Sequence, residues 1–307
     1  MRIVNDKERA ETSSPASLVA VASYGLMSAI AISTLIFGPL PMIAAHLRLS
    51  EPWPKITALL GALLALTVLD VPLMVVVIVF IFGLFIADNV VRGSEFWPFL
   101  IKAVALGLST GVLIVLVMAE IQKVSPVAYW SQTVEGLVQQ FQKALPNEEV
   151  VRLDLMKTIF LFEGPFLYVA ALMLSFWLCV GLVAHLNWLS PTHPLSATSL
   201  RKVRLPLALS VVFVAIFVST FVGEVPTRYV LNGVFRVMSG MMIIQGCVCL
   251  SAVLSIKMVR PRVRTALYSF SILFGLPVLI VIGVISPWLF RNNRMKEPVS
   301  GGLEGVV

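Results

Sequence analysis

The stretch Pro72–Ala87, PLMVVVIVFIFGLFIA, carries neither a charged nor a polar side chain. Apolar residues fill every side of a helix built from it, so no face of this segment suits water. A helix that crosses a bilayer needs about 20 mainly apolar residues. The segment therefore predicts a transmembrane helix, and similar stretches recur along the whole chain.

The composition extends this interpretation to the rest of the protein. Hydrophobic residues make up 58% of the chain and charged residues 13%, and the mean hydropathy is +0.95. Soluble domains carry about 25% charged residues, so lipid must solvate most of this surface. We predict an all-α polytopic transmembrane bundle of about eight spans, in the range of seven to eight, near residues 18–37, 54–69, 72–87, 99–119, 158–186, 205–222, 229–256 and 267–290.

The spans predict a single transmembrane helical domain over residues 17–291. A polar tail, residues 1–16, precedes it, and a Gly-rich tail, residues 292–307, follows it and is expected to be disordered. Residues 120–157 form the longest polar stretch and are expected to lie outside the membrane.

One external amphipathic helix is expected within this polar stretch. It begins near Tyr129 and Trp130 and is stopped by Pro146. Its apolar residues recur at helical spacing, at Val134, Leu137, Val138, Phe141 and Leu145. We interpret the helix either as a lid on the outer face or as a plain interfacial connector.

The first span ends at Gly38-Pro39-Leu40-Pro41. No straight helix tolerates this sequence, so Gly38, Pro39 and Pro41 predict a helix break. The short apolar piece 42–49 that follows has three interpretations: a half-helix, a re-entrant segment or an interfacial turn.

Basic loops suggest an orientation. The two densest, residues 201–204 and 257–264, are separated by two spans, and both are expected in the cytoplasm. Eight spans would then place both chain ends outside, together with Arg291 and its basic neighbours. Either the rule is locally violated or the spans between residues 38 and 72 are miscounted.

Ionisable and amide side chains inside the spans indicate a candidate ligand site, because such groups are costly in lipid. Arg236 lies in the seventh predicted span, Asn232 one turn earlier on the same face, and Gln245 further along. Glu163 lies near the start of the fifth span and could pair with Arg236. These four residues predict a site for an anionic or polar ligand. The alternative is that Arg236 extends to the outer interface from a helix that starts late.

Small residues at intervals of four let helices approach closely. Gly25, Ala29 and Ser33 form one such stripe, and Gly107 and Gly111 form a second pair. Both have two interpretations: packing within the bundle, or docking of a partner subunit.

The sequence lacks the common catalytic and metal-binding motifs H-E-x-x-H, G-x-S-x-G and G-x-x-x-x-G-K-[ST]. Cys247-Val-Cys249 has the wrong spacing for a zinc or redox pair. We therefore expect no enzymatic activity, no cofactor and no metal. The net charge of +7 comes from Lys and Arg scattered over the loops, as expected for topology determinants, so no nucleic-acid partner is predicted.

The chain resembles the YybS-like family of predicted bacterial membrane proteins, a domain of unknown function. Four places carry the likeness: Gly38-Pro39-Leu40-Pro41, Arg204-Leu205-Pro206, Gln245-Gly246 and the run Ile282–Arg291. The last is similar to the Gly-hydrophobic-Asp-x-Trp-x-x-x-Arg close of the family, with Ser286 where an Asp is usual. The resemblance covers about residues 18–294.

The resemblance also implies a role. The family is similar in architecture to the substrate-capture subunits of energy-coupling-factor vitamin transporters and to the shape-determining protein MreD. It implies a multi-pass protein of a bacterial cytoplasmic (inner) membrane, and the stripe starting at Gly25 resembles the face on which capture subunits dock their coupling partner. We expect a transport-related subunit that binds a small polar solute and works with other integral membrane proteins. The alternative is a non-transporting scaffold that assembles an envelope, cell-shape or division complex.

Overall fold

The computed structural model describes residues 18–34, 37–144, 150–186, 188–221, 225–256, 263, 267 and 275–292. Within these ranges the chain is helical and contains no strand, which confirms the predicted all-α class. The helices are α2 (Leu18–Ser33), α3 (Pro39–Arg48), α4 (Trp53–Thr67), α5 (Leu73–Arg92), α6 (Phe96–Ile121), α7 (Pro126–Ala144), α8 (Val150–His185), α9 (Ala197–Leu200), α10 (Leu207–Ser219), α11 (Val225–Ile256) and α13 (Leu276–Asn292).

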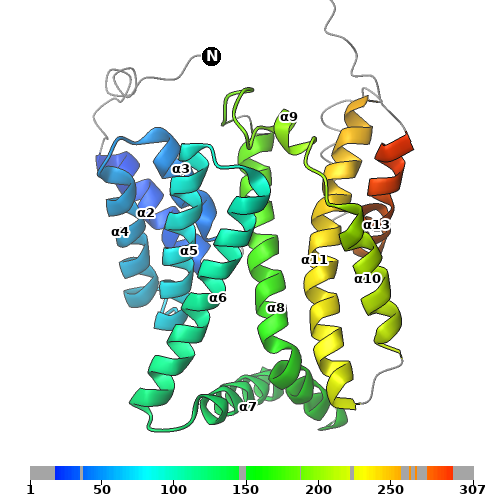
Figure 1. Cartoon of the computed structure of the whole chain (residues 1–307). Helices are drawn as coiled ribbons and strands as arrows, with labels where there is room; N and C mark the ends of the chain where they lie inside the picture. Colours follow the sequence, from blue (N-terminus) through cyan, green and yellow to red (C-terminus); the bar gives the residue numbers. More distant parts are fainter. Residues whose placement is uncertain are drawn as a thin grey trace, which may run out of the picture.

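The bundle has the lengths and surfaces of a multi-pass membrane protein (Figure 1). The helices α5 and α6, with residues 154–185 of α8 and 228–254 of α11, are long and apolar enough to cross a bilayer. Shorter apolar helices, α2, α4, α10 and α13, accompany them. Large apolar side chains are exposed along these helices, as lipid solvation requires, including Leu18, Leu59, Ile101, Val211 and Val278.

The predicted break after the first span separates two helices. Gly38 precedes α3, and Pro39 and Pro41 lie in its first turn, where a missing backbone N–H is tolerated. The short piece that follows is thus a helix, and it is buried in the bundle through Met42 and Ile43.

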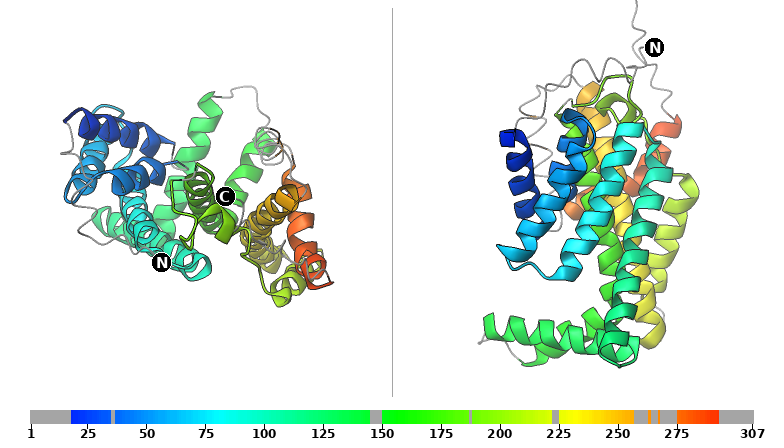
Figure 2. Two further views of the ribbon diagram at one scale, coloured as in Figure 1. Left: turned by 90° about the horizontal axis from the view of Figure 1, so that it is seen from above. Right: turned by 90° about the vertical axis from the view of Figure 1, so that its left-hand side faces the viewer.

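The α2–α3 pair enters the bundle and returns to the same end, which favours the re-entrant interpretation. Gly38 lies against Val79, and Gly83 lies against Pro39 and Met42, so α3 runs parallel to α5. Since α4 connects the two, α3 ends where α4 begins. Figures 1 and 2 show α2 beginning at that same end. The suspected miscount of spans between residues 38 and 72 therefore lies at α2 and α3, which together enter and leave the bundle at one end.

The loop that contains α9 closes this end of the bundle. His193 Nδ1 accepts a hydrogen bond from the Leu195 amide at 3.1 Å, so its Nε2 carries the proton and donates to the Val90 carbonyl at 2.9 Å. Burial lowers the pKa of His193, although the Val90 carbonyl opposes this shift. The neutral imidazole thereby satisfies a carbonyl of the last turn of α5.

Aromatic side chains join the two halves of the bundle. Phe96 and Phe99 of α6 meet Phe176 and Trp177 of α8 edge-on, with ring centroids 4.7 Å apart for Phe99 and Phe176. These rings are buried, and edge-to-face pairs are favourable beyond their area alone. They hold the upright part of α8 against α6, between the two groups of helices seen in Figure 1.

Glycines set the closest helix contact, between α11 and α13. A Cβ at Gly246 would lie 2.1 Å from the Leu279 carbonyl oxygen, and a Cβ at Gly283 would lie 2.0 Å from that of Met242. The pairing order shows that the two helices run antiparallel. Backbone occupies both positions, so no side-chain rotation could make room for a larger residue.

Replacing Gly246 by Ala should therefore destabilise the protein by about 1–3 kcal/mol, the usual cost of overpacking. The matched control is Gly136→Ala in α7, where no atom lies within 4 Å of the added methyl group. That change should be neutral or slightly stabilising, because Ala favours helix over Gly. Thermal unfolding of both variants in one detergent measures the difference, and equal midpoints would contradict the packing described here.

Several predicted boundaries shift in the structure. The helix α8 begins at Val150, before the predicted span start at residue 158, so the segment 120–157 is not wholly separate from that helix. The first helix ends at Ser33 rather than residue 37, and α10 is shorter than the predicted span 205–222. The tail 1–16, residues 293–307 and most of 257–274 lie outside the described residues.

Candidate functional site

A proline bends α8 near its middle. Pro165 has no N–H, so the carbonyl of Leu161, four residues earlier, cannot form its helical hydrogen bond. The indole Nε1 of Trp130 in α7 donates to this carbonyl at 3.2 Å. The residue before the proline, Gly164, leaves space for the ring, since a Cβ there would lie 2.7 Å from Trp130.

Further contacts fix α7 to the bundle. Lys157 Nζ of α8 pairs with Glu135 Oε1 of α7 at 2.6 Å, and the buried Tyr129 places its hydroxyl 3.6 Å from Met74 Sδ of α5. The helix α7 lies across the end of the bundle opposite α9, with the first turns of α8 beside it (Figures 1 and 2). These turns leave the line of the upright part of α8, and they carry three of the residues described below.

The repair of the bend by Trp130 can be tested with a double-mutant cycle. Trp130→Phe keeps most of the ring but removes the donor, which should cost about 1–3 kcal/mol by leaving the Leu161 carbonyl unpaired. Pro165→Ala supplies a backbone N–H to that carbonyl. Trp130→Phe should therefore cost clearly less in the Pro165→Ala background, as measured by thermal unfolding. Additive costs would show that the indole does not serve the freed carbonyl.

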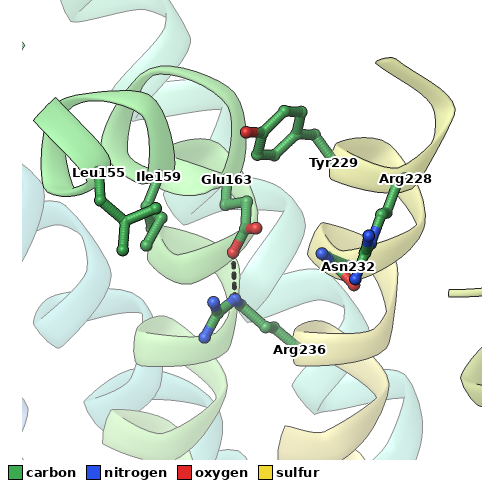
Figure 3. Close-up of a pocket in the computed structure, with 7 residues that line it drawn as sticks. All are labelled: Leu155, Ile159, Glu163, Arg228, Tyr229, Asn232 and Arg236. Atoms are coloured by element: carbon green, nitrogen blue, oxygen red, sulfur yellow. Dashed lines mark hydrogen bonds and ion pairs between the residues drawn. The ribbon is translucent and has the colours of Figure 1, made fainter. Parts of the chain in front are cut away.

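A pocket of about 380 Å³ lies between the first turns of α8 and those of α11. Figure 3 shows its side chains facing a common space from the two helices. One wall comes from α8 and the other from α11. The lining residues are Leu155, Ile159, Glu163, Arg228, Tyr229, Asn232 and Arg236.

An ion pair joins the two walls. The Arg236 Nε donates to Glu163 Oε2, and Figure 3 shows this contact in the middle of the pocket. The Glu163 side chain is only 3% exposed, whereas that of Arg236 is 42% exposed. A buried carboxylate without a partner is very costly, so Arg236 is what makes an ionised Glu163 tolerable here.

The α11 wall presents its polar groups at helical spacing. Arg228, Asn232 and Arg236 follow one another at intervals of four on one face. Tyr229 lies beside them and stacks on Phe162 of α8 with ring centroids 5.1 Å apart. Guanidinium and amide donors of Arg228 and Asn232 thus lie together at the space between the helices (Figure 3), an arrangement suited to an oxyanion.

The unequal burial of the pair predicts unequal mutant effects. Arg236→Gln leaves a buried carboxylate without a partner, which should cost about 3–5 kcal/mol. Glu163→Gln leaves an arginine that can reach water, so its cost should be smaller. Thermal unfolding of the two variants and of the double variant measures this order. A larger loss for Glu163→Gln would contradict the assigned burial.

The structure brings together three of the four predicted ligand residues, Glu163, Asn232 and Arg236. The fourth, Gln245, is predicted wrongly as a neighbour of this pocket. It is fully buried further along α11, toward the C-terminal end of this helix. Its Oε1 accepts a hydrogen bond from the Leu205 amide at 3.2 Å. Leu205 lies just before Pro206, the N-cap of α10, so Gln245 pairs a buried backbone amide that precedes this helix.

The pocket also contains residues that the sequence interpretation missed. Arg228 shares the helical spacing of Asn232 and Arg236, so that spacing could have identified it. Leu155 and Ile159 fall in the stretch that was assigned to the polar segment or to the edge of a span. Only the early start of α8 brings them to the pocket.

The first small-residue stripe packs within the bundle. Gly25 lies against Leu60 of α4, and Ala29 is buried with its backbone close to Gly61 of the same helix. The side chain of Ser33 lies outside the described part of the structure. Because α4 covers this face, the docking alternative finds no open surface at Gly25 and Ala29.

The second small-residue pair packs in the same way, against α8. Gly107 lies against Leu172, and Gly111 against the ring of Tyr168. The Tyr168 hydroxyl donates to the Gly107 carbonyl at 3.0 Å. These glycines thus serve a contact between two helices of the same chain.

No metal site is evident in the part of the chain that the structure describes, where no three His, Cys, Asp or Glu side chains cluster closely enough. Cys179, Cys247 and Cys249 are buried free thiols.

Comparisons of the chain with models of known families, with curated proteins and with solved structures find no match. The resemblance to the YybS-like family therefore stays a prediction, and the pocket must be interpreted from its own chemistry.

Proposed function

We propose that this protein binds a small anionic or polar solute in the pocket between α8 and α11, as a transport-related subunit of a bacterial cytoplasmic membrane. The observation that carries the proposal is the Glu163–Arg236 ion pair inside a pocket that also holds Arg228 and Asn232. Ionisable groups at such positions are costly and are typical of ligand sites. An energising membrane partner belongs to the proposal.

The charge distribution supports a pocket that opens to the outside. At the α9 end, basic residues outnumber acidic ones, with Arg48, Lys55, Arg92, Lys102, Arg201, Lys202 and Arg204 against Glu51, Asp88 and Glu95. Among the described residues of the α7 end the two signs nearly balance. By the positive-inside rule the α9 end faces the cytoplasm. The pocket, at the α7 end, would then receive its solute from the outer side.

The packing of the small residues weakens the scaffold alternative. That alternative rested on stripes open to other integral proteins, yet Gly25 and Ala29 face α4, and Gly107 and Gly111 face α8. The pocket, in contrast, contains two arginines against one glutamate, together with the Asn232 amide. The packing of α8 against α11 does not by itself require these polar groups.

A binding screen tests the proposal directly. The protein would be placed in nanodiscs of a zwitterionic lipid, and its thermal unfolding followed with inorganic phosphate, succinate, glutamate and octanoate. A ligand at 100 times its Kd stabilises a protein by about 2.7 kcal/mol, so at least one anion should raise the Tm.

The screen needs two variants. Arg228→Gln should reduce the shift, whereas Lys143→Gln, which removes an exposed cation from α7 at the same end, should not. The proposal fails if no anion shifts the midpoint, or if Arg228→Gln responds as the wild type does. Co-purification with cell-wall enzymes and no anion response would favour the scaffold.

A further inference from the structure

The two walls of the pocket differ in chemistry. The α11 wall presents Arg228, Tyr229 and Asn232, whereas the described lining residues of the α8 wall beyond Glu163 are the aliphatic Leu155 and Ile159 (Figure 3). A ligand that fills this space meets donors on one side and hydrocarbon on the other. Such a site discriminates against ligands that are polar all round, because they would lose hydration along the aliphatic wall.

The charges of the pocket limit the charge of its ligand. Glu163 already balances Arg236 through their ion pair. Arg228 is exposed and makes no ion pair with any residue that the structure describes. Among the described residues, one positive charge of the pocket therefore has no counter-charge, and it lies beside the Asn232 amide (Figure 3). A ligand with a single negative charge restores neutrality, and a guanidinium binds the two oxygens of a carboxylate or phosphate ester well.

The size of the pocket indicates that the ligand is more than an inorganic ion. About 380 Å³ falls within the range of sites for small organic molecules, roughly 300–1,000 Å³. Apolar surface continues outward from the aliphatic wall, since Leu155 and Phe162 are each 57% exposed. An apolar body attached to the anionic head could lie along this surface and bury area worth about 25 cal/mol per Å².

We infer that the ligand of this pocket is an organic monoanion: a carboxylate or phosphodiester head bound by Arg228 and Asn232, with an apolar body against Leu155 and Ile159. This inference rests on the proposed function and narrows its substrate class. The same chemistry is offered by a free acid and by the headgroup of an anionic lipid, and the experiment separates these sources.

The test measures equilibrium binding of radiolabelled octanoate to the full chain in phosphatidylcholine nanodiscs. Arg228→Gln should weaken binding by about tenfold or more, the loss expected for one charged hydrogen-bonding group. Ile159→Thr should weaken it several-fold through the lost apolar contact. Lys143→Gln should bind as the wild type does. Octylammonium and inorganic phosphate, added as competitors, should not displace octanoate.

A second arm identifies the source of the anion. Nanodiscs that contain phosphatidylglycerol should bind less octanoate if a lipid headgroup occupies the site, and the same amount if the natural ligand is a free acid. Both results support an organic monoanion. Displacement by octylammonium, or wild-type affinity in Arg228→Gln or Ile159→Thr, would overturn the inference.

Failure of this inference remains distinguishable from failure of the proposed function. If phosphate or glutamate stabilises the protein through Arg228 while octanoate does not bind, the pocket is a solute site of another class. If no anion binds at all, both proposals fail.

Discussion

A carboxylate that the protein itself buries almost completely needs a counter-charge, and this constraint determines how the helices meet at the α7 end of the bundle. Glu163 and Arg236 lie on different helices and are far apart in sequence, so their pairing fixes how α8 and α11 meet. The space left around the pair becomes the pocket. The remaining positive charge of the pocket lies on Arg228, which shares one face of α11 with Arg236.

The pair depends on a second backbone feature, the bend at Pro165. A straight α8 would carry its first turns away from their present place beside α7, together with Leu155 and Ile159. The bend leaves a carbonyl without a partner, and Trp130 supplies the donor. The helix α7 thereby supports the pocket through its contact with α8. This role agrees better with the connector interpretation of α7 than with the lid interpretation.

The sequence predicted the features that depend on local composition. Unbroken apolar stretches predicted the helical membrane bundle, and the spacing of Asn232 and Arg236 predicted part of the site. Features that depend on contacts between distant segments were harder to predict. The return of α3 along α5 needs Gly38 and Gly83 to meet residues of the opposite helix. Gln245 was misassigned because its partner, the Leu205 amide, lies forty residues away.

The most direct test of the central claim is a cross-link between the two walls of the pocket. Phe162 and Tyr229 stack beside the ion pair, so a short bis-methanethiosulfonate cross-linker, which reduction removes, should join cysteines placed at these positions. The three natural cysteines are buried. With a protease site placed in the exposed turn near Pro191, the cleaved fragments should stay joined until reduction. Fragments that separate without reduction, although both cysteines react with maleimide, would contradict the account.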